Sequence, residues 1–163
     1  MLASNMLDAA TLVTYGLPGL FVLAFLAGSI VPVPSEALMI ALLAGGAEPI
    51  PTVAVATAGN FLGAATLFWL GRYAGKGETG GLVGWATRAT RTDPARFDRA
   101  MATVRRWGPA ALLFSWAPLL GDLLVIGAGA IGVGVVPFAI FTAIGKSARF
   151  LAVALAAIAA LGG

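Results

Sequence analysis

The sequence predicts an all-α integral membrane protein, built as an inverted repeat in which each half is a re-entrant helical hairpin followed by a transmembrane helix. Three observations predict this fold. First, 60% of the 163 residues are hydrophobic and only 10% are charged, whereas soluble domains carry about 25% charged residues. Second, two broken apolar segments alternate with two long ones. Third, the second half of the chain repeats features of the first half. We expect one membrane domain over 1–163, with repeat one at about 17–71, a basic loop at 72–106 and repeat two at about 107–161.

The uninterrupted membrane crossings are expected at 51–71 and 137–161. The first stretch carries no charged residue, and the second carries only Lys146 and Arg149. Crossing a hydrocarbon core about 30 Å thick takes about 20 apolar residues in a helix, and both stretches meet that length.

The other two apolar regions are each interrupted in the middle. The first is broken at 31–36, a stretch that ends in Glu36, and the second is broken at 118–122, which ends in Asp122. Their arms reach only about 15 to 22 Å as helices, which is short for a span. The prolines in both breaks disfavour a continuous helix. Such a pattern predicts a re-entrant hairpin, whose open backbone must be buried in protein or line a wet cavity. The alternative for each region is a pair of short, kinked spans.

An internal repeat supports the hairpins. An offset of 86 residues aligns 24–59 with 110–145 without a gap, and ten of the 36 pairs are identical, where chance would give roughly a tenth. The break proline Pro118 matches Pro32, and Glu36 stands opposite Asp122. With one full crossing per repeat, the two repeats must have opposite orientations, as in the inverted repeats of transporters.

The charges set the expected orientation. The loop at 72–106 contains eight basic and three acidic residues, and the rest of the chain sums to −2. The positive-inside rule places this loop in the cytoplasm and both termini outside; four full spans would instead put the termini on the side of the loop. Within the loop, Asp93 before a proline predicts a helix start, and Phe97, Met101 and Val104 predict an amphipathic helix on the inner leaflet. An ordinary basic linker is the alternative.

Composition excludes several functions. The chain has no Cys and no His, so it has no disulfide, no thiol nucleophile, no imidazole base and no common zinc ligand set. We expect no cofactor and no metal. The basic charge is concentrated in one loop of a membrane protein, and nucleic acid is therefore not an expected partner.

Four charged residues lie inside the predicted membrane segments: Glu36, Asp122, Lys146 and Arg149. Each costs on the order of 3 kcal/mol at the bilayer centre, and two acids with two bases could pair. Thr142, Lys146 and Arg149 form one stripe on the last span. We expect the acids to bind protons or cations and the two bases to bind a substrate phosphate. A static cluster of ion pairs is the alternative.

With these residues in view, the chain resembles the DedA family, also called SNARE-associated Golgi or VTT-domain proteins, and in particular its short YqaA-like bacterial branch. The resemblance covers about 19–153. It rests on the charged residues above and on supporting residues in ordered motifs, which are Pro34, Ser35, Asn60, Gly63, Arg72, Pro118 and Gly121. The sequence departs from the family at Ser35, which replaces a glycine, and at Asn60, where many members carry an acid.

The resemblance implies transport or flipping of lipids linked to the proton-motive force, with undecaprenyl phosphate or phospholipid as substrates. We therefore expect a lipid flippase or scramblase rather than an enzyme, in multiple passes across a bacterial inner membrane. The expected partners are a membrane lipid and protons or cations, and a homo-oligomer is left open. Two alternatives are an intramembrane lipid-phosphate enzyme that uses Glu36 and Asp122 as acid and base, and a structural or assembly membrane protein.

Overall fold

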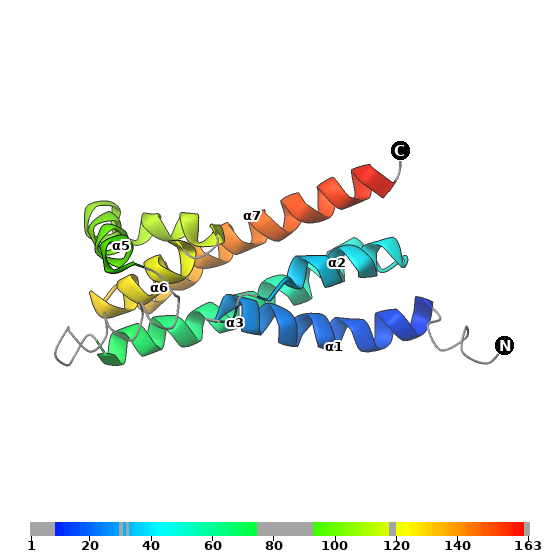
Figure 1. The fold of residues 1–163 in the computed structure, drawn as a ribbon, viewed down its shortest axis with the longest axis horizontal. Coiled ribbons are helices and arrows are strands. Elements are labelled where there is room, and N and C mark those ends of the chain that lie inside the picture. Colours follow the sequence, from blue (N-terminus) through cyan, green and yellow to red (C-terminus); the bar gives the residue numbers. More distant parts are fainter. Residues whose placement is uncertain (1–8, 30, 32, 75–92, 118–119, 162–163) are drawn as a thin grey trace.

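The computed structural model describes residues 9–29, 31, 33–74, 93–117 and 120–161, and in these ranges every regular element is a helix. The elements form an elongated bundle (Figure 1). They are α1 (Ala9–Gly28), α2 (Ser35–Ala44), α3 (Pro49–Ala74), α5 (Pro94–Trp107), the 3₁₀ helix η1 (Gly108–Trp116), α6 (Leu120–Ala130) and α7 (Val135–Leu161).

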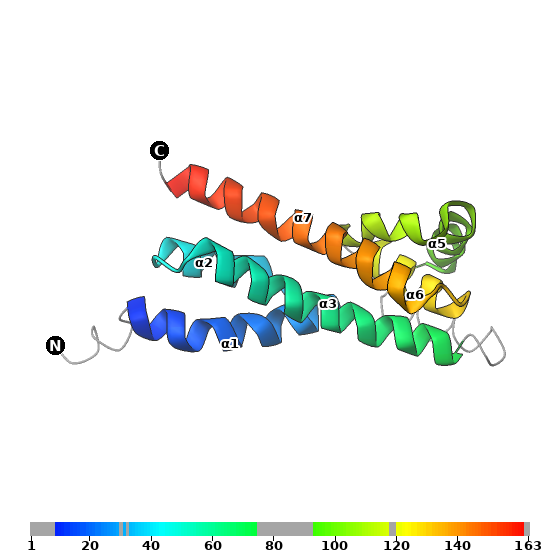
Figure 2. The ribbon, with the colours of Figure 1, turned by 180° about the vertical axis from the view of Figure 1, so that it is seen from behind.

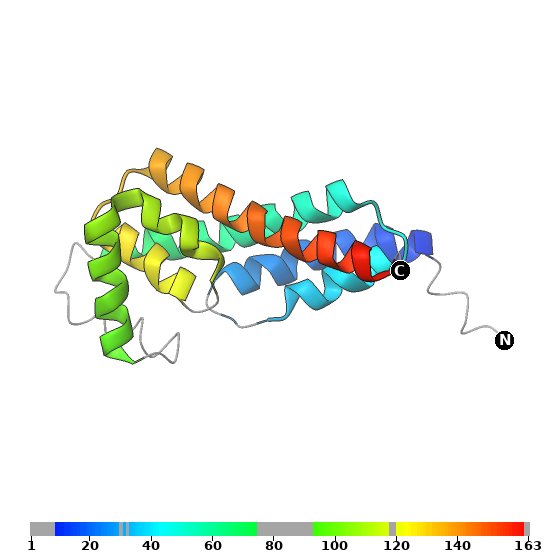
Figure 3. The same cartoon turned by 90° about the horizontal axis from the view of Figure 1, so that it is seen from above.

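The two long helices lie where the membrane crossings are predicted. In the described part of the chain, α3 and α7 are the helices that are long and apolar enough to cross a membrane. Each begins two residues before its predicted start, and α3 continues to Ala74, into the predicted loop. The prolines near their starts fall in the first turn, where a helix needs no backbone donor. The two helices run in opposite directions, and they cross when the molecule is viewed from above (Figure 3).

Each long helix is preceded by two shorter elements that double back, α1 and α2 before α3 and η1 and α6 before α7 (Figure 2). Glu36 and Asp122 lie in the first turns of α2 and α6 rather than in the breaks, because a carboxylate interacts favourably with the positive end of a helix. The first arm of the second segment is a 3₁₀ helix of nine residues, not the expected α-helix. A 3₁₀ helix rises about 2.0 Å per residue, so this short arm extends further than an α-helix of equal length.

The offset of the sequence repeat is also an offset of the structure. When 86 is added to the residue numbers of α2 and α3, their first and last residues agree with those of α6 and α7 to within one residue. The turns after α2 and α6 match in detail: Gly46 and Gly132 have φ of 89° and 80°, and their amides donate to Leu43 and Gly129 at 3.1 Å in both cases. Glycine is required here because other residues rarely adopt positive φ at a helix end.

The predicted helix in the basic loop is confirmed as α5. The carboxylate of Asp93 accepts a hydrogen bond from the amide of Ala95 at 3.1 Å. Helix α5 lies across one end of the bundle (Figure 3). Its apolar residues Phe97 and Val104 are buried in the protein core, so the expectation that this face inserts into the leaflet is wrong. The rest of the predicted loop, 75–92, lies outside the described residues.

Two apolar clusters form the core and leave a polar layer between them. One includes Phe68 and Phe138 near α5, and the other includes Met39 and Phe150 in the half where α1 begins and α7 ends. Asn60 on α3 and Lys146 on α7 fall between the residues that these helices contribute to the two clusters. The fold therefore places polar side chains at mid-length of the two long helices.

Candidate functional site

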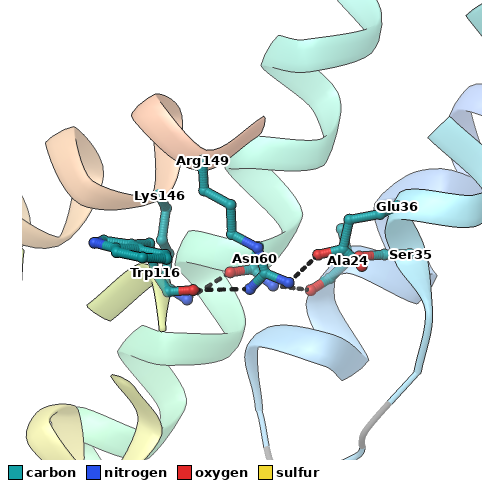
Figure 4. A network of polar contacts seen from close by, with 7 residues as sticks. All are labelled: Ala24, Ser35, Glu36, Asn60, Trp116, Lys146 and Arg149. Carbon is teal, nitrogen blue, oxygen red and sulfur yellow. Dashed lines mark hydrogen bonds and ion pairs between the residues drawn. The ribbon is translucent and has the colours of Figure 1, made fainter. Parts of the chain in front are cut away.

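Polar groups from both halves of the chain meet at mid-length of the bundle (Figure 4). Helix α7 contributes Lys146 and Arg149, α3 contributes Asn60, and α2 contributes Glu36 from its first turn. We call these four residues the central polar cluster. Gly59 and Gly63 of α3 lie against the backbone of α1, and Gly145 of α7 lies against that of η1; such small residues let helices approach closely.

Arg149 joins the two broken segments. Its Nη2 forms an ion pair with Oε1 of Glu36, 113 residues away. Its Nη1 donates to the carbonyl oxygen of Trp116, the last residue of η1, at 3.1 Å. The side chains of Arg149 and Glu36 are 27% and 23% exposed. The expected meeting of opposite charges is therefore present, and it connects the start of α2 to the end of η1 through α7.

Lys146 forms a second link at the cluster. Its ammonium group donates to Oδ1 of Asn60, and Nδ2 of Asn60 donates to the carbonyl oxygen of Ala24 in α1 at 3.0 Å. Lys146 and Asn60 are each only 3% exposed, and a buried ammonium requires such an acceptor. The two residues are separated by 86 positions, so they occupy equivalent places in the two repeats.

The second predicted acid, Asp122, is placed differently. Glu36 and Arg149 form the ion pair recorded among the described residues, and Asp122 has no ionic partner within that part of the chain. Asp122 does lie within electrostatic range of Lys146 and Arg149. The repeat explains the asymmetry, because the position equivalent to Arg149 is Gly63, which carries no charge.

The third member of the predicted stripe, Thr142, is fully buried. Its hydroxyl has no hydrogen-bond partner among the described residues, and the same holds for the hydroxyl of Ser115 in η1. Buried polar groups without partners are uncommon. They add two unsatisfied donors near the central polar cluster.

The supporting residues have separate places. Ser35 is buried, and its hydroxyl lies 3.5 Å from Oε2 of Glu36. Pro34 directly precedes α2. A Cβ atom at Gly63 would collide with the backbone of α1 at Phe25, so Gly63 serves helix packing.

The remaining supporting residues are further along the two segments. A Cβ atom at Gly121 would collide with the carbonyl group of Ser115, which fits the tight start of α6. Arg72 is not brought to the central polar cluster, because it lies 12 residues, or about 18 Å, beyond Asn60 along α3. Its guanidinium instead lies 5.6 Å from the ring centroids of Phe68 and Trp69. Pro118 lies outside the described residues.

Sequence reasoning missed the backbone acceptors and one side chain of the site. The carbonyl oxygens of Trp116 and Ala24 hold Arg149 and Asn60, and no residue-type pattern predicts a backbone acceptor. Ser115 was visible as an identical pair with Ser29 in the repeat, and that identity was the available signal for its place beside the cluster.

The central polar cluster can hold a ligand through ionic interactions and hydrogen bonds. Among the described residues, no group of three or more His, Cys, Asp or Glu is arranged to hold a metal ion. Two acids and two bases balance one another within the bundle. An anion that reached Arg149 would compete with Glu36 for the same guanidinium nitrogens, and a proton on Glu36 would weaken the pair.

Comparison with known proteins gives the family. The VTT domain matches residues 33–158, which contain every described helix from α2 to α6 and all but the last three residues of α7, whereas α1 precedes the match. The inner membrane protein YqaA of Escherichia coli is 34% identical over 140 residues, which cover 85% of this chain and 89% of YqaA. An uncharacterized protein of Haemophilus influenzae is 30% identical over 143 residues, which cover 82% of each chain.

No solved structure matches the sequence with significance. The family match spans most of the chain, including every residue of the central polar cluster. The composition, the two apolar helices and the relatives agree that this is a membrane protein. The chain belongs to the VTT-domain family, also known as the DedA family.

Proposed function

We propose that this protein moves phosphate-bearing lipids, undecaprenyl phosphate or phospholipid, across a bacterial inner membrane in a proton-linked cycle. The observation that carries the proposal is the ion pair of Glu36 and Arg149 at mid-length of the bundle. A charged pair at that depth is costly in a membrane, and such residues commonly mark the path of a substrate or ion. The family resemblance supplies the substrate class.

The architecture of the proposal is an inverted repeat of re-entrant hairpins. Helices α2 and α6 have 10 and 11 residues, or about 15 to 17 Å, about half of the hydrocarbon core. Helices α3 and α7 run in opposite directions (Figure 1). The contact between the equivalent positions Asn60 and Lys146 supports a pseudo-two-fold axis, because only residues near such an axis touch their own counterparts. In this arrangement the two breaks face each other at the midplane.

The proposed orientation puts α5 at the cytoplasmic surface and both termini outside. The exposed arginines of α5 support this side under the positive-inside rule. YqaA is named an inner membrane protein, and we extend that location to this chain, with multiple passes.

In the proposed step, the lipid phosphate replaces Glu36 on Arg149. Arg149 presents two nitrogens in a fork that suits a phosphate. Protonation of Glu36 weakens its hold on Arg149 and frees the guanidinium for the headgroup, while release of the proton restores the pair. Lys146 and Asp122 supply the second positive and negative charge near the same place. No bond is made or broken, so the protein acts as a transporter and not as an enzyme.

The test uses purified protein in sealed vesicles with a fluorescent phospholipid in one leaflet and a membrane-impermeant quencher outside. We expect the protein to accelerate exchange between leaflets, and a pH gradient to change the rate. Arg149→Gln should lower the rate at least about tenfold, which corresponds to about 1.4 kcal/mol. Arg105→Gln, an exposed arginine on α5, is the matched control and should retain the rate.

A polyprenyl phosphate analogue in a parallel assay separates the two substrate classes. Wild-type protein that moves neither lipid, with or without a pH gradient, would contradict the proposal. Chemical conversion of a lipid phosphate in detergent would point instead to an enzyme.

A further inference from the structure

A groove separates α3 and α7 on the half of the bundle where α1 begins and α7 ends. Its volume is about 460 Å³, and it extends from Pro49 to Phe61 along α3 and from Ile158 to Ala143 along α7. The walls come from these two helices only, and they are apolar except for Thr57 and Ser147. The separation of the two helices on this side is visible in Figure 2.

The opposite half of the bundle shows why this groove is open. There, stacked phenylalanines pack α3 against α7. The ring centroids of Phe68 and Phe138 lie 4.1 Å apart, and those of Phe61 and Phe138 lie 5.9 Å apart. At an offset of 86 residues, the positions equivalent to Phe61, Phe68 and Phe138 are Ser147, Ala154 and Thr52. The groove is therefore the place where the repeat lacks its aromatic filling.

The inner end of the groove lies next to the central polar cluster along both helices, and none of the four cluster residues lines it. Phe61 and Ser147 line the groove, and they directly follow Asn60 and Lys146 in the chain. The outer part is flanked by apolar side chains that are more than half exposed, such as Leu151 and Leu155. The walls therefore suit a ligand that is apolar along its length, and the neighbouring cluster supplies charges for a polar end that lies outside the groove.

The membrane around the groove indicates which apolar ligand occupies it. The walls belong to the two helices that are long and apolar enough to cross the membrane, and acyl chains are the solvent along such helices. The volume lies within the range of about 300–1,000 Å³ found for ligand sites. A cavity left empty would lose the contacts of its walls, so an acyl chain from the bilayer is the available filling.

We infer that the groove between α3 and α7 binds one acyl chain of a membrane phospholipid, with the headgroup end directed toward the central polar cluster. The inference deepens the proposed function and rests on it for the role of Arg149 as the phosphate partner. It makes the bound tail part of the site, so the phospholipid is held at both ends rather than by its headgroup alone.

The test measures binding and needs no transport. Wild-type protein is reconstituted in vesicles of phosphatidylethanolamine and phosphatidylglycerol that contain a phospholipid with a photoreactive group on one acyl chain. After irradiation, cross-linked peptides are mapped by mass spectrometry. In a second measurement, protein purified in mild detergent is analysed for retained phospholipid. We expect cross-links concentrated in 49–61 and 143–158, and about one retained phospholipid per chain.

Ala58→Phe places a bulky side chain in the groove, at an exposed position of α3. We expect it to lower the retained phospholipid about tenfold. Ala152→Phe makes the same change at an exposed position of α7 that does not line the groove, and it should leave retention unchanged.

Three results would overturn the inference: equal retention in the two variants, cross-links spread evenly over the surface, or a second copy of the chain or a polyprenyl phosphate found in the groove. If the groove retains phospholipid as expected and the vesicle assay shows no movement, the binding site stands and the proposed transport is wrong.

Discussion

Arg149 is the residue through which the first and second halves are held together at the centre. It pairs with Glu36 of α2 and donates to Trp116 of η1. Lys146 is held by neutral groups instead: its ammonium donates to the side-chain amide of Asn60, which in turn donates to the carbonyl oxygen of Ala24. The site thus contains one partly exposed ionic link and one buried polar link, and these should respond differently to substitution.

A double-mutant cycle with Glu36→Gln and Arg149→Gln tests the ionic link. Fully buried pairs lose about 3–5 kcal/mol when one partner is removed, while exposed pairs are worth about 0–1 kcal/mol. The side chains here are about one quarter exposed, so we expect a coupling free energy of about 1–2 kcal/mol. The measurement is equilibrium unfolding in mixed micelles with increasing denaturing detergent. A coupling near zero would show that the two charges are independently solvated.

At the scale of elements, the matched turns after α2 and α6 define where each short helix stops. Gly46 and Gly132 have positive φ, and a Cβ atom there would meet no neighbouring atom. Only the backbone conformation therefore opposes a larger residue at these positions.

We expect Gly46→Ala and Gly132→Ala each to lower the free energy of unfolding by about 1–2 kcal/mol. Gly45→Ala is the matched control, because Gly45 has an ordinary φ of −78°, which alanine adopts without strain. The same detergent unfolding assay gives the values. Equal effects at Gly45 and Gly46 would mean that the turn conformation is not what limits stability.

The sequence predicted the long helices, the breaks and the repeat because each depends on local signals. Apolar length defines α3 and α7, proline and glycine define their ends, and Asp93 defines the start of α5. Non-local contacts were less accessible. The apolar face of Phe97 and Val104 was visible, but whether lipid or protein covers it depends on the position of η1 and α6. For the same reason, pairing between the acids and the bases was expected, whereas the choice of Glu36 as the partner of Arg149 and the acceptor at Trp116 were not.

At the scale of the whole molecule, the proposed fold makes a prediction about sidedness. The chain contains no cysteine, so single cysteines can report access to each face. We expect Glu48→Cys, in the turn before α3, to react with an impermeant thiol reagent from outside the cell, and Thr103→Cys, an exposed position on α5, to react only after the membrane is opened.

Cysteines added at the two termini decide between topologies. The inverted repeat places both on the side of Glu48. Four full spans would place them on the side of Thr103, and labelling of the termini only in opened cells would therefore rule out the hairpin arrangement.

The contact of Asn60 with Lys146 has a consequence for the origin of the two halves. In an antiparallel pair of identical halves, a residue on the axis faces a copy of itself. Two asparagines can satisfy one another, since each amide both donates and accepts, but two lysines would place like charges together in a nonpolar interior. In the proposed inverted repeat, a dimer of the second half alone would place two lysines at the axis, whereas one chain with two diverged halves places a single cation there, paired with Asn60.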